Sequence, residues 1–406
     1  MKTFAQLIIL TAFVASCASD KQSKNGLAYI DLRKDYPEKE ILLTDIADVT
    51  YLYLNSDDDD YLYKAYEHVQ RGGISDLTKN TVVVVDAASE SILFFSKDGT
   101  PKSRFNRRGL GPEEYFLFFS TVRYDETADE VYISNLESNV IQVYSSTGEH
   151  KRRITLPQGI NVRELIDFDD RSLFVFDNRI ETQRSLARNR GEDLPTDDYV
   201  IPFYRISKTN GEVLDKVELP GTHLFLGINW NGMRIVNGSS VFSVKCPEGV
   251  MLCSSGTDTI FLYTGHKPIA PVICQTPSTA SLNPLEYLDF CLDRVQYQFI
   301  KVVIVREGDK APAAFPVKYY MRNKKTEETV RPKFILPDYK EKELIIDPYN
   351  RNSVGGFHDD GYWFELDLYE LKQAYRDDKL SGKLKELVAT LNEDIDNNVF
   401  VLVDFK

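Results

Sequence analysis

Short apolar segments alternate with polar turns along most of the chain, and one stretch of this pattern occurs twice. Residues 82–105 align without a gap with residues 131–154, at an offset of 49 positions, and 7 of the 24 aligned positions are identical. Each copy holds runs of β-branched and aromatic residues that are typical of strands. Gly99 and Gly148 occupy equivalent positions, where a hairpin turn requires a positive φ. The repeat predicts a modular β-fold, because one such unit cannot bury its own apolar face.

The same pattern can be followed along the chain as six four-stranded units. Their strands, from the innermost outward, are expected at 64–70, 81–86, 92–96 and 102–105; at 117–124, 131–134, 140–144 and 151–156; at 161–169, 172–177, 200–207 and 213–219; at 240–246, 250–254, 259–264 and 269–274; at 287–294, 298–305, 316–322 and 330–336; and at 353–357, 362–366, 399–405 and 49–54. The last unit takes its outer strand from near the N-terminus, which closes a ring and leaves no open edge. We therefore predict an all-β fold, a six-bladed β-propeller.

A small helical insertion near the C-terminus is the exception to the β pattern. Its apolar residues fall on one helix face and are Leu380, Leu384, Leu387, Val388 and Leu391. Packing against the propeller is the default expectation for this stripe, and docking of a partner is the alternative.

Strand direction within a blade determines on which of the two faces of the ring each connection lies. Connections between the second and third strands, and between one blade and the next, share one face; the remaining turns lie on the other. The long connections on the first face are 57–60, 107–115, 178–199, 306–315 and 367–397. We expect this elaborated face to carry a binding site, because loops over a rigid scaffold commonly do so.

The N-terminus resembles the leader of a bacterial lipoprotein. Lys2 precedes an apolar run, and small residues precede Cys17, so residues 1–16 are expected to be a signal peptide and Cys17 to carry lipid. The alternative is an ordinary signal peptide with an incidental cysteine. Residues 17–27 are then the lipidated cysteine and a flexible tether, and residues 28–406 form a single propeller domain. The expected location is the outer membrane, with the leaflet left open.

Charge and cysteine content exclude some functions. The formal net charge is −13, and removal of the leader takes away only one lysine, so the chain has no basic surface for nucleic acid. Four further cysteines have no CxxC spacing, and we expect buried free thiols. Cys246 and Cys253 are expected to flank a turn at 247–249 without facing each other. No metal site and no cofactor are predicted.

Three segments make the resemblance to a known family specific. RRGLGPEEY at 107–115, IADVTYLYL at 46–54 and NNVFVLVDFK at 397–406 resemble the six-bladed propeller lipoproteins of Bacteroidota, which are related to NHL-type propellers. The resemblance implies a propeller fold and an envelope location. It implies no catalytic residues.

The most distinctive candidate site is the segment 107–115. Two glycines let the backbone pass close to the channel mouth, and an arginine can bind a carboxylate or sulfate in a forked geometry. The ligand-binding residues expected here are Arg107, Arg108, Gly109, Gly111 and Glu113, with Arg184 and Arg188 of the 178–199 insertion. The structural alternative is a tight crossing between blades, with each arginine paired inside the protein.

Two acidic clusters are better explained as structure than as chemistry. Asp57 to Asp60 could ligate calcium, but a run of carboxylates is usually solvated. His358 to Asp360 could form a catalytic cluster, but it precedes Gly361 in a predicted turn on the plain face.

Two functions are compatible with these features. The first is a non-enzymatic binding or scaffold lipoprotein for a glycan, peptide or envelope protein. The alternative is a propeller hydrolase or lyase that acts on a carbohydrate with carboxylates at the channel mouth. The sequence has no G-x-S-x-G and no HExxH motif, which removes several common chemistries.

Overall fold

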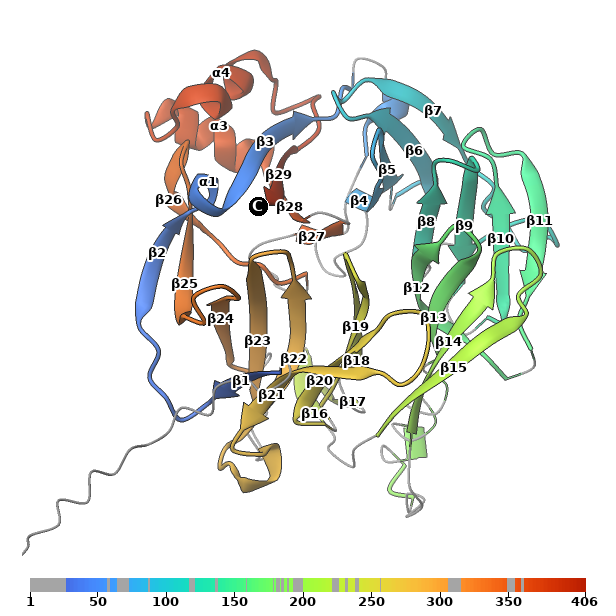
Figure 1. The fold of residues 1–406 in the computed structure, drawn as a ribbon. Helices are drawn as coiled ribbons and strands as arrows, with labels where there is room; N and C mark the ends of the chain where they lie inside the picture. Colours follow the sequence, from blue (N-terminus) through green and yellow to red (C-terminus); the bar gives the residue numbers. More distant parts are fainter. Residues whose placement is uncertain are drawn as a thin grey trace, which may run out of the picture.

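Six blades are arranged in a ring (Figure 1). The computed structural model describes residues 27–56, 59–63, 73–86, 88–116, 121–135, 138–157, 159–177, 179, 183, 186–187, 190–192, 200–220, 226–230, 233–237, 241–255, 257–305, 315–348, 355–358 and 361–406.

The first two blades contain the repeat. Blade 1 comprises β4 Gly73–Leu77, β5 Thr81–Asp86, β6 Ser91–Ser96 and β7 Pro101–Phe105. Blade 2 comprises β8 Thr121–Asp125, β9 Glu130–Ser134, β10 Val140–Tyr144 and β11 His150–Thr155. Gly99 and Gly148 have φ of +86° and +85°, which confirms the predicted turns. The expected inner strand at 64–70 was wrong, since β4 forms the inner strand and 64–70 lies outside the described residues.

Blades 3 and 4 follow the expected strands closely. Blade 3 comprises β12 Val162–Asp169, β13 Ser172–Asp177, β14 Val200–Ser207 and β15 Val213–Pro220. Blade 4 comprises β18 Val241–Cys246, β19 Gly249–Ser254, β20 Thr259–Tyr263 and β21 Ala270–Thr276. An unpredicted hairpin, β16 Leu226–Trp230 and β17 Met233–Asn237, lies between them in the sequence.

Blades 5 and 6 close the ring. Blade 5 comprises β22 Leu285–Asp293, β23 Tyr297–Val305, β24 Val317–Asn323 and β25 Thr329–Leu336, with β26 Tyr339–Leu344 paired to β25. Blade 6 comprises β27 Gly355–His358, β28 Gly361–Leu366, β29 Val399–Phe405 and β3 Ala47–Tyr53. β3 pairs antiparallel with β29, from Tyr53 opposite Val399 to Ala47 opposite Phe405, which confirms the predicted closure.

The N-terminal segment also extends two other blades. β1 Ala28–Asp31 pairs in parallel with β21, and β2 Glu38–Leu42 pairs in parallel with β25. Neither strand was predicted, because a parallel partner distant in sequence leaves no hairpin signal. A single helical turn, α1 Leu43–Ile46, then leads into β3.

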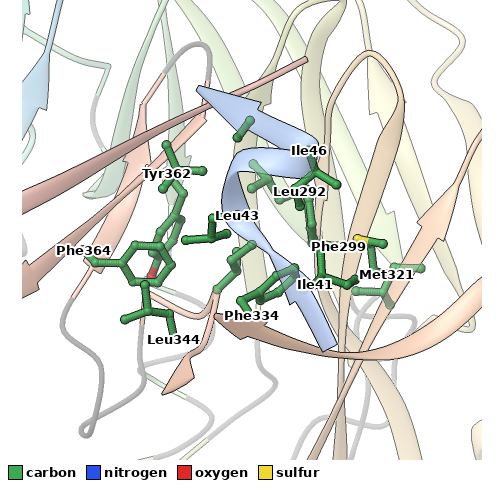
Figure 2. Close-up of a cluster of buried hydrophobic side chains, with 14 of the residues drawn as sticks. Ile41, Leu43, Ile46, Leu292, Phe299, Met321, Phe334, Leu344, Tyr362 and Phe364 are labelled. Carbon is green, nitrogen blue, oxygen red and sulfur yellow. The ribbon is translucent and has the colours of Figure 1, made fainter. Parts of the chain in front are cut away.

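This N-terminal segment contributes side chains to the core between blades 5 and 6. Figure 2 shows Ile41, Leu43 and Ile46 among apolar side chains of both blades, including Phe299, Phe334, Tyr362 and Phe364. Leu43 has no exposed surface. The segment therefore fills the space between the two blades as well as supplying a strand.

The helical insertion contains two helices where one was predicted. α3 Leu368–Arg376 begins at Asp367, whose side chain accepts a hydrogen bond from the Glu370 N–H. α4 Gly382–Thr390 buries Leu384 and Val388 of the predicted stripe. Both helices lie beside β3 and β26 (Figure 1), and their buried residues join the main core, so the stripe packs against the propeller.

The cysteines at 246, 253, 274 and 291 are free thiols, as predicted. The predicted turn at 247–249 was one residue too long. Cys246 lies opposite Gly249, and Cys253 lies opposite Phe242, because the turn contains only residues 247 and 248. Three of the thiols are buried and Cys274 is partly exposed.

Candidate functional site

The channel opens on the face of the tight turns into a polar cavity of about 410 Å³. Its lining residues come from the carboxyl ends of the inner strands β4, β8, β12, β18 and β27 and from the turns that follow them. The volume lies within the range of about 300–1,000 Å³ that is usual for small-ligand sites. We call this cavity the turn-face mouth. It lies on the face opposite the one that the sequence singles out.

Lys208 is the central buried charge of the turn-face mouth. It follows β14, is 6% exposed, and places its Nζ 2.6 Å from Asp125 Oδ2 and 2.8 Å from Asp167 Oδ1. The two carboxyl groups belong to different blades, so the ammonium group links blade 2 to blade 3. The Nζ also lies 5.7 Å from the ring centroid of Tyr132, a cation–π contact.

Asp125 and Asp167 share one ammonium group, yet their pKa values shift in opposite directions. Burial raises the pKa of Asp125, but the hydrogen bonds from Lys208 and from turn N–H groups outweigh it and lower that pKa overall. Burial dominates at Asp167 and raises its pKa despite the same lysine. Burial lowers the pKa of Lys208, yet the two carboxylates raise it overall, so the lysine stays charged.

Most other carboxylates of the turn-face mouth are engaged in turns. Glu126 accepts hydrogen bonds from the hydroxyls of Thr78 and Thr81 and from the N–H of Asn80. Asp76 accepts hydrogen bonds from the backbone N–H groups of Leu77 and Tyr124. Asp169 accepts hydrogen bonds from the Arg171 N–H and from the Ser172 hydroxyl. These acids shape the rim, and their oxygens are already partly satisfied.

A buried arginine holds three blades together at the same face. Arg294 lies in the turn between β22 and β23 and is 3% exposed. Its guanidinium donates to the carbonyl oxygens of Lys245 in blade 4 (3.2 Å), Asp293 in blade 5 (2.8 Å) and His358 in blade 6 (2.8 Å). His358 ends β27 on the plain face, as predicted, and lines the turn-face mouth. Asp359 and Asp360 lie outside the described residues.

The predicted segment 107–115 is a crossing between blades in which each arginine has a partner. The Arg107 Nε donates to the carbonyl oxygen of Gly148 in blade 2 (3.0 Å), and the Arg108 Nε lies 3.1 Å from Glu90 Oε2 in blade 1. Tyr115 is fully buried and donates to the Glu90 carbonyl oxygen. These contacts match the structural alternative.

The two glycines of the segment accommodate an acidic side chain of the same loop. Glu114 Oε2 accepts a hydrogen bond from the Gly111 N–H at 2.6 Å, and a Cβ on Gly109 would lie 1.9 Å from this oxygen. Glu113 lies 3.8 Å from His150 Nδ1, and its side chain is 70% exposed. A role for this loop in ligand binding stays a prediction.

Several predicted residues lie outside the described part of the chain. They are Cys17, Asp57, Asp58, Arg184 and Arg188. Asp60 is described and pairs with Arg104 at 2.6 Å. Within the described residues, no group of three or more His, Cys, Asp or Glu is arranged to hold a metal ion. A search of the same residues finds no helix with the length and apolar character needed to cross a membrane.

The sequence analysis did not single out Arg123, Lys208, Ser243 or Lys245. A signal was present in the inner strands, where polar residues alternate with buried apolar ones in TVRYD and VFSVKC. In an inner strand the polar side faces the channel, so alternation identifies channel-lining residues once a strand is known to be innermost.

The ring and its central mouth define the class of protein, a six-bladed β-propeller. Residues 18–194 match the family model described as "6-bladed beta-propeller". The ring and this match together identify the chain as a six-bladed β-propeller protein, which confirms the fold that the sequence resemblance implied.

A solved structure from Bacteroides has a similar fold. A Bacteroides fragilis NCTC 9343 protein described as a "Putative exported protein" is 16% identical, with 94% of this chain and 99% of that chain covered and a TM-score of 0.60. A Bacteroides vulgatus ATCC 8482 protein is 10% identical, with 89% and 97% covered and a TM-score of 0.46. No curated protein matches the chain. The likeness to the first structure supports the fold.

Proposed function

We propose that the protein is an envelope-anchored binding module that takes a glycan or peptide ligand in its turn-face mouth. The observation that carries the proposal is the open polar cavity of about 410 Å³ at the end of the channel. Its walls come from five blades, so a ligand there contacts a rigid scaffold at little cost in ordering. Half of its lining residues are charged, which suits a polar ligand better than an apolar one.

The anchor belongs to the same proposal. Cys17 follows a lipoprotein-type leader, and the lipid it receives holds the propeller at the outer membrane. Metabolic labelling with a radioactive or clickable fatty acid tests this step. The wild-type chain is expected to incorporate label and the Cys17→Ser variant to lose it. Equal labelling of both chains contradicts the anchor.

Binding is tested with two tryptophan variants that obstruct opposite faces. Thr127 is exposed at the rim of the turn-face mouth, and Leu110 is 95% exposed on the 107–115 crossing. The full chain, purified in detergent, is screened on arrays of bacterial surface oligosaccharides and peptides, and hits are measured by calorimetry. Thr127→Trp is expected to weaken binding at least tenfold, and Leu110→Trp to leave it unchanged.

A third variant tests the loop that the sequence favours. Arg107→Ala combined with Arg108→Ala is expected to leave affinity unchanged, because both arginines have partners in the protein. Loss of binding in this variant or in Leu110→Trp, with Thr127→Trp unaffected, moves the site to the elaborated face. If no oligosaccharide or peptide binds, the proposal fails.

A second candidate is a hydrolase or lyase that uses the acids at Lys208. The observation in its favour is the separation of the Asp125 and Asp167 pKa values in opposite directions, the pattern expected of an acid and base pair. Against it, the shared lysine already binds both acids. If the protein is an enzyme, Asp167→Asn is expected to abolish turnover of a bound saccharide and to keep the affinity for it. If the protein is a binding module, the wild-type chain is expected to release no cleaved product.

A further inference from the structure

Arg123 is a fixed cation in the wall of the turn-face mouth. It lies in β8, where Thr121, Arg123 and Asp125 alternate with Val122 and Tyr124, which are buried between blades. Its Nη1 donates to the carbonyl oxygens of Ser75 (2.9 Å) and Val122 (2.8 Å). Both bonds are made by the same terminal nitrogen, and together they fix the plane of the guanidinium group. The Nε and Nη2 donors are left for another partner.

No carboxylate among the described residues lies within ion-pair distance of Arg123. This contrasts with the acids of the mouth, since Asp125 and Asp167 share Lys208, and Glu126 is bound by hydroxyl and N–H donors. The exposed rim adds Lys79, Asp169 and Asp170, and Asp169 lies 3.7 Å from Arg205 Nη1. Six carboxylates and four basic side chains line the mouth, and most of these carboxylates already accept hydrogen bonds within the protein, whereas the outer edge of Arg123 can take an external anion.

Polar groups that suit hydroxyls lie on β12 and β18, the next two inner strands around the ring from β8. Ser243 and Lys245 line the same cavity, and the Ser243 hydroxyl donates to Glu164 Oε2 at 2.6 Å. Burial raises the pKa of Glu164, and the Ser243 hydroxyl together with the charges of Arg163 and Arg123 lowers it only in part, so Arg123 already acts electrostatically on this buried acid. Donors and acceptors therefore line the same cavity as Arg123, an arrangement that suits a polyhydroxylated ligand carrying one acid.

We propose that Arg123 recognises the carboxylate of an acidic saccharide, with the Nε and Nη2 edge binding both carboxylate oxygens. The sugar hydroxyls then contact Lys245, Ser243 and the rim acids. This inference rests on the proposed function, because it names the ligand class of the same mouth. A guanidinium with a fixed plane favours a planar carboxylate by paired charge-assisted hydrogen bonds.

Two saccharides that differ in one group test the inference. The probes are a cello-oligosaccharide and its counterpart oxidised at C6 to glucuronic acid, titrated into the full chain in detergent by calorimetry. The acidic probe is expected to bind at least tenfold more tightly. Arg123→Gln is expected to remove this preference by weakening acid binding tenfold while leaving neutral binding unchanged. Arg123→Lys keeps the positive charge without the forked pair of donors, and it is expected to keep part of the preference for the acidic probe.

Arg171→Gln is the matched control, because it removes the same charge from an exposed position on the same face. It is expected to bind both probes as wild type does, and thermal melting confirms that each variant is folded. Equal affinity for both probes, unchanged in Arg123→Gln, overturns the inference and leaves the proposed function intact. Binding of an acidic peptide but of neither saccharide also overturns it. The Thr127→Trp and Leu110→Trp variants test the proposed function independently of this inference.

Discussion

Gly148 of blade 2 packs directly against Phe105, the last residue of the outer strand of blade 1. A Cβ on Gly148 would lie 2.5 Å from the Phe105 Cβ. A Cβ on the equivalent Gly99 would lie 1.9 Å from the Tyr53 carbonyl oxygen of blade 6, and a Cβ on Gly211 would lie 2.7 Å from Ile154 Cγ2 of blade 2. The repeated glycine therefore serves two purposes, since it permits the positive φ and lets one blade approach the next.

Gly148→Ala is expected to lower the free energy of unfolding by about 2–4 kcal/mol, through an unfavourable φ and overpacking against Phe105. Gly191→Ala is the control, because Gly191 has φ +70° and no atom within 4 Å of the added Cβ. It is expected to cost only about 1 kcal/mol. Urea denaturation measures both, and equal losses would show that the inter-blade contact contributes nothing.

Lys208→Met is expected to destabilise the protein by about 1–3 kcal/mol, because it leaves Asp125 and Asp167 without their shared counter-ion. The value is at the low end for buried pairs, since the two acids keep some solvent contact. A triple variant that adds Asp125→Asn and Asp167→Asn is expected to recover part of the loss. If it is less stable than Lys208→Met alone, repulsion between the acids is not the cause.

Glu365 is expected to make stability fall as the pH rises. Burial raises its pKa, and the bonds that Oε1 accepts from Asn398 (2.9 Å) and Tyr63 (3.3 Å) lower it only in part. The folded state thus binds more protons than the unfolded state between the unfolded pKa, about 4.3, and the raised folded pKa. Stability from this group is therefore present below that window and declines through it.

Denaturation midpoints at a series of pH values test this sign. Glu365→Gln is expected to flatten the decline, and Glu386→Gln, at an exposed position in α4, to keep the wild-type profile. A wild-type curve that rises through the window more steeply than that of Glu365→Gln would contradict the assignment.

Leu43→Ala is expected to cost about 2–5 kcal/mol, because Leu43 is fully buried between blades 5 and 6. Leu42→Ala is the control at the preceding position, where the leucine is 39% exposed, and it is expected to cost less than 1 kcal/mol. Chemical denaturation distinguishes them. Similar losses would indicate that the segment fills no well-packed space.

The strands were predictable from sequence where hairpins are short and regular. The 49-residue repeat located blades 1 and 2, and Asn210-Gly211 marked a turn of blade 3. β1 and β2 could not be found, because their parallel partners lie more than 200 residues away. The turn between Cys246 and Cys253 was mispredicted, because the composition of this segment does not distinguish a turn of two residues from a turn of three.

The candidate site was harder to predict than the fold. The 107–115 segment is distinctive because it must cross between blades, and its arginines have structural partners. Arg123 and Lys245 lie in ordinary strand sequences, and only the ring brings them to one cavity. Loop composition alone therefore points to a segment whose residues packing explains, whereas the cavity depends on five inner strands that only the ring brings together.

The pairing of β3 with β29 sets the order of events during biogenesis. Ala47 leaves the ribosome some 350 residues before its partner Phe405, so the outer strand of the last blade waits for the end of the chain. A contact of such sequence separation forms slowly. A chain that is still being synthesised can therefore build blades 1 to 5, but it cannot close the ring until β29 is made.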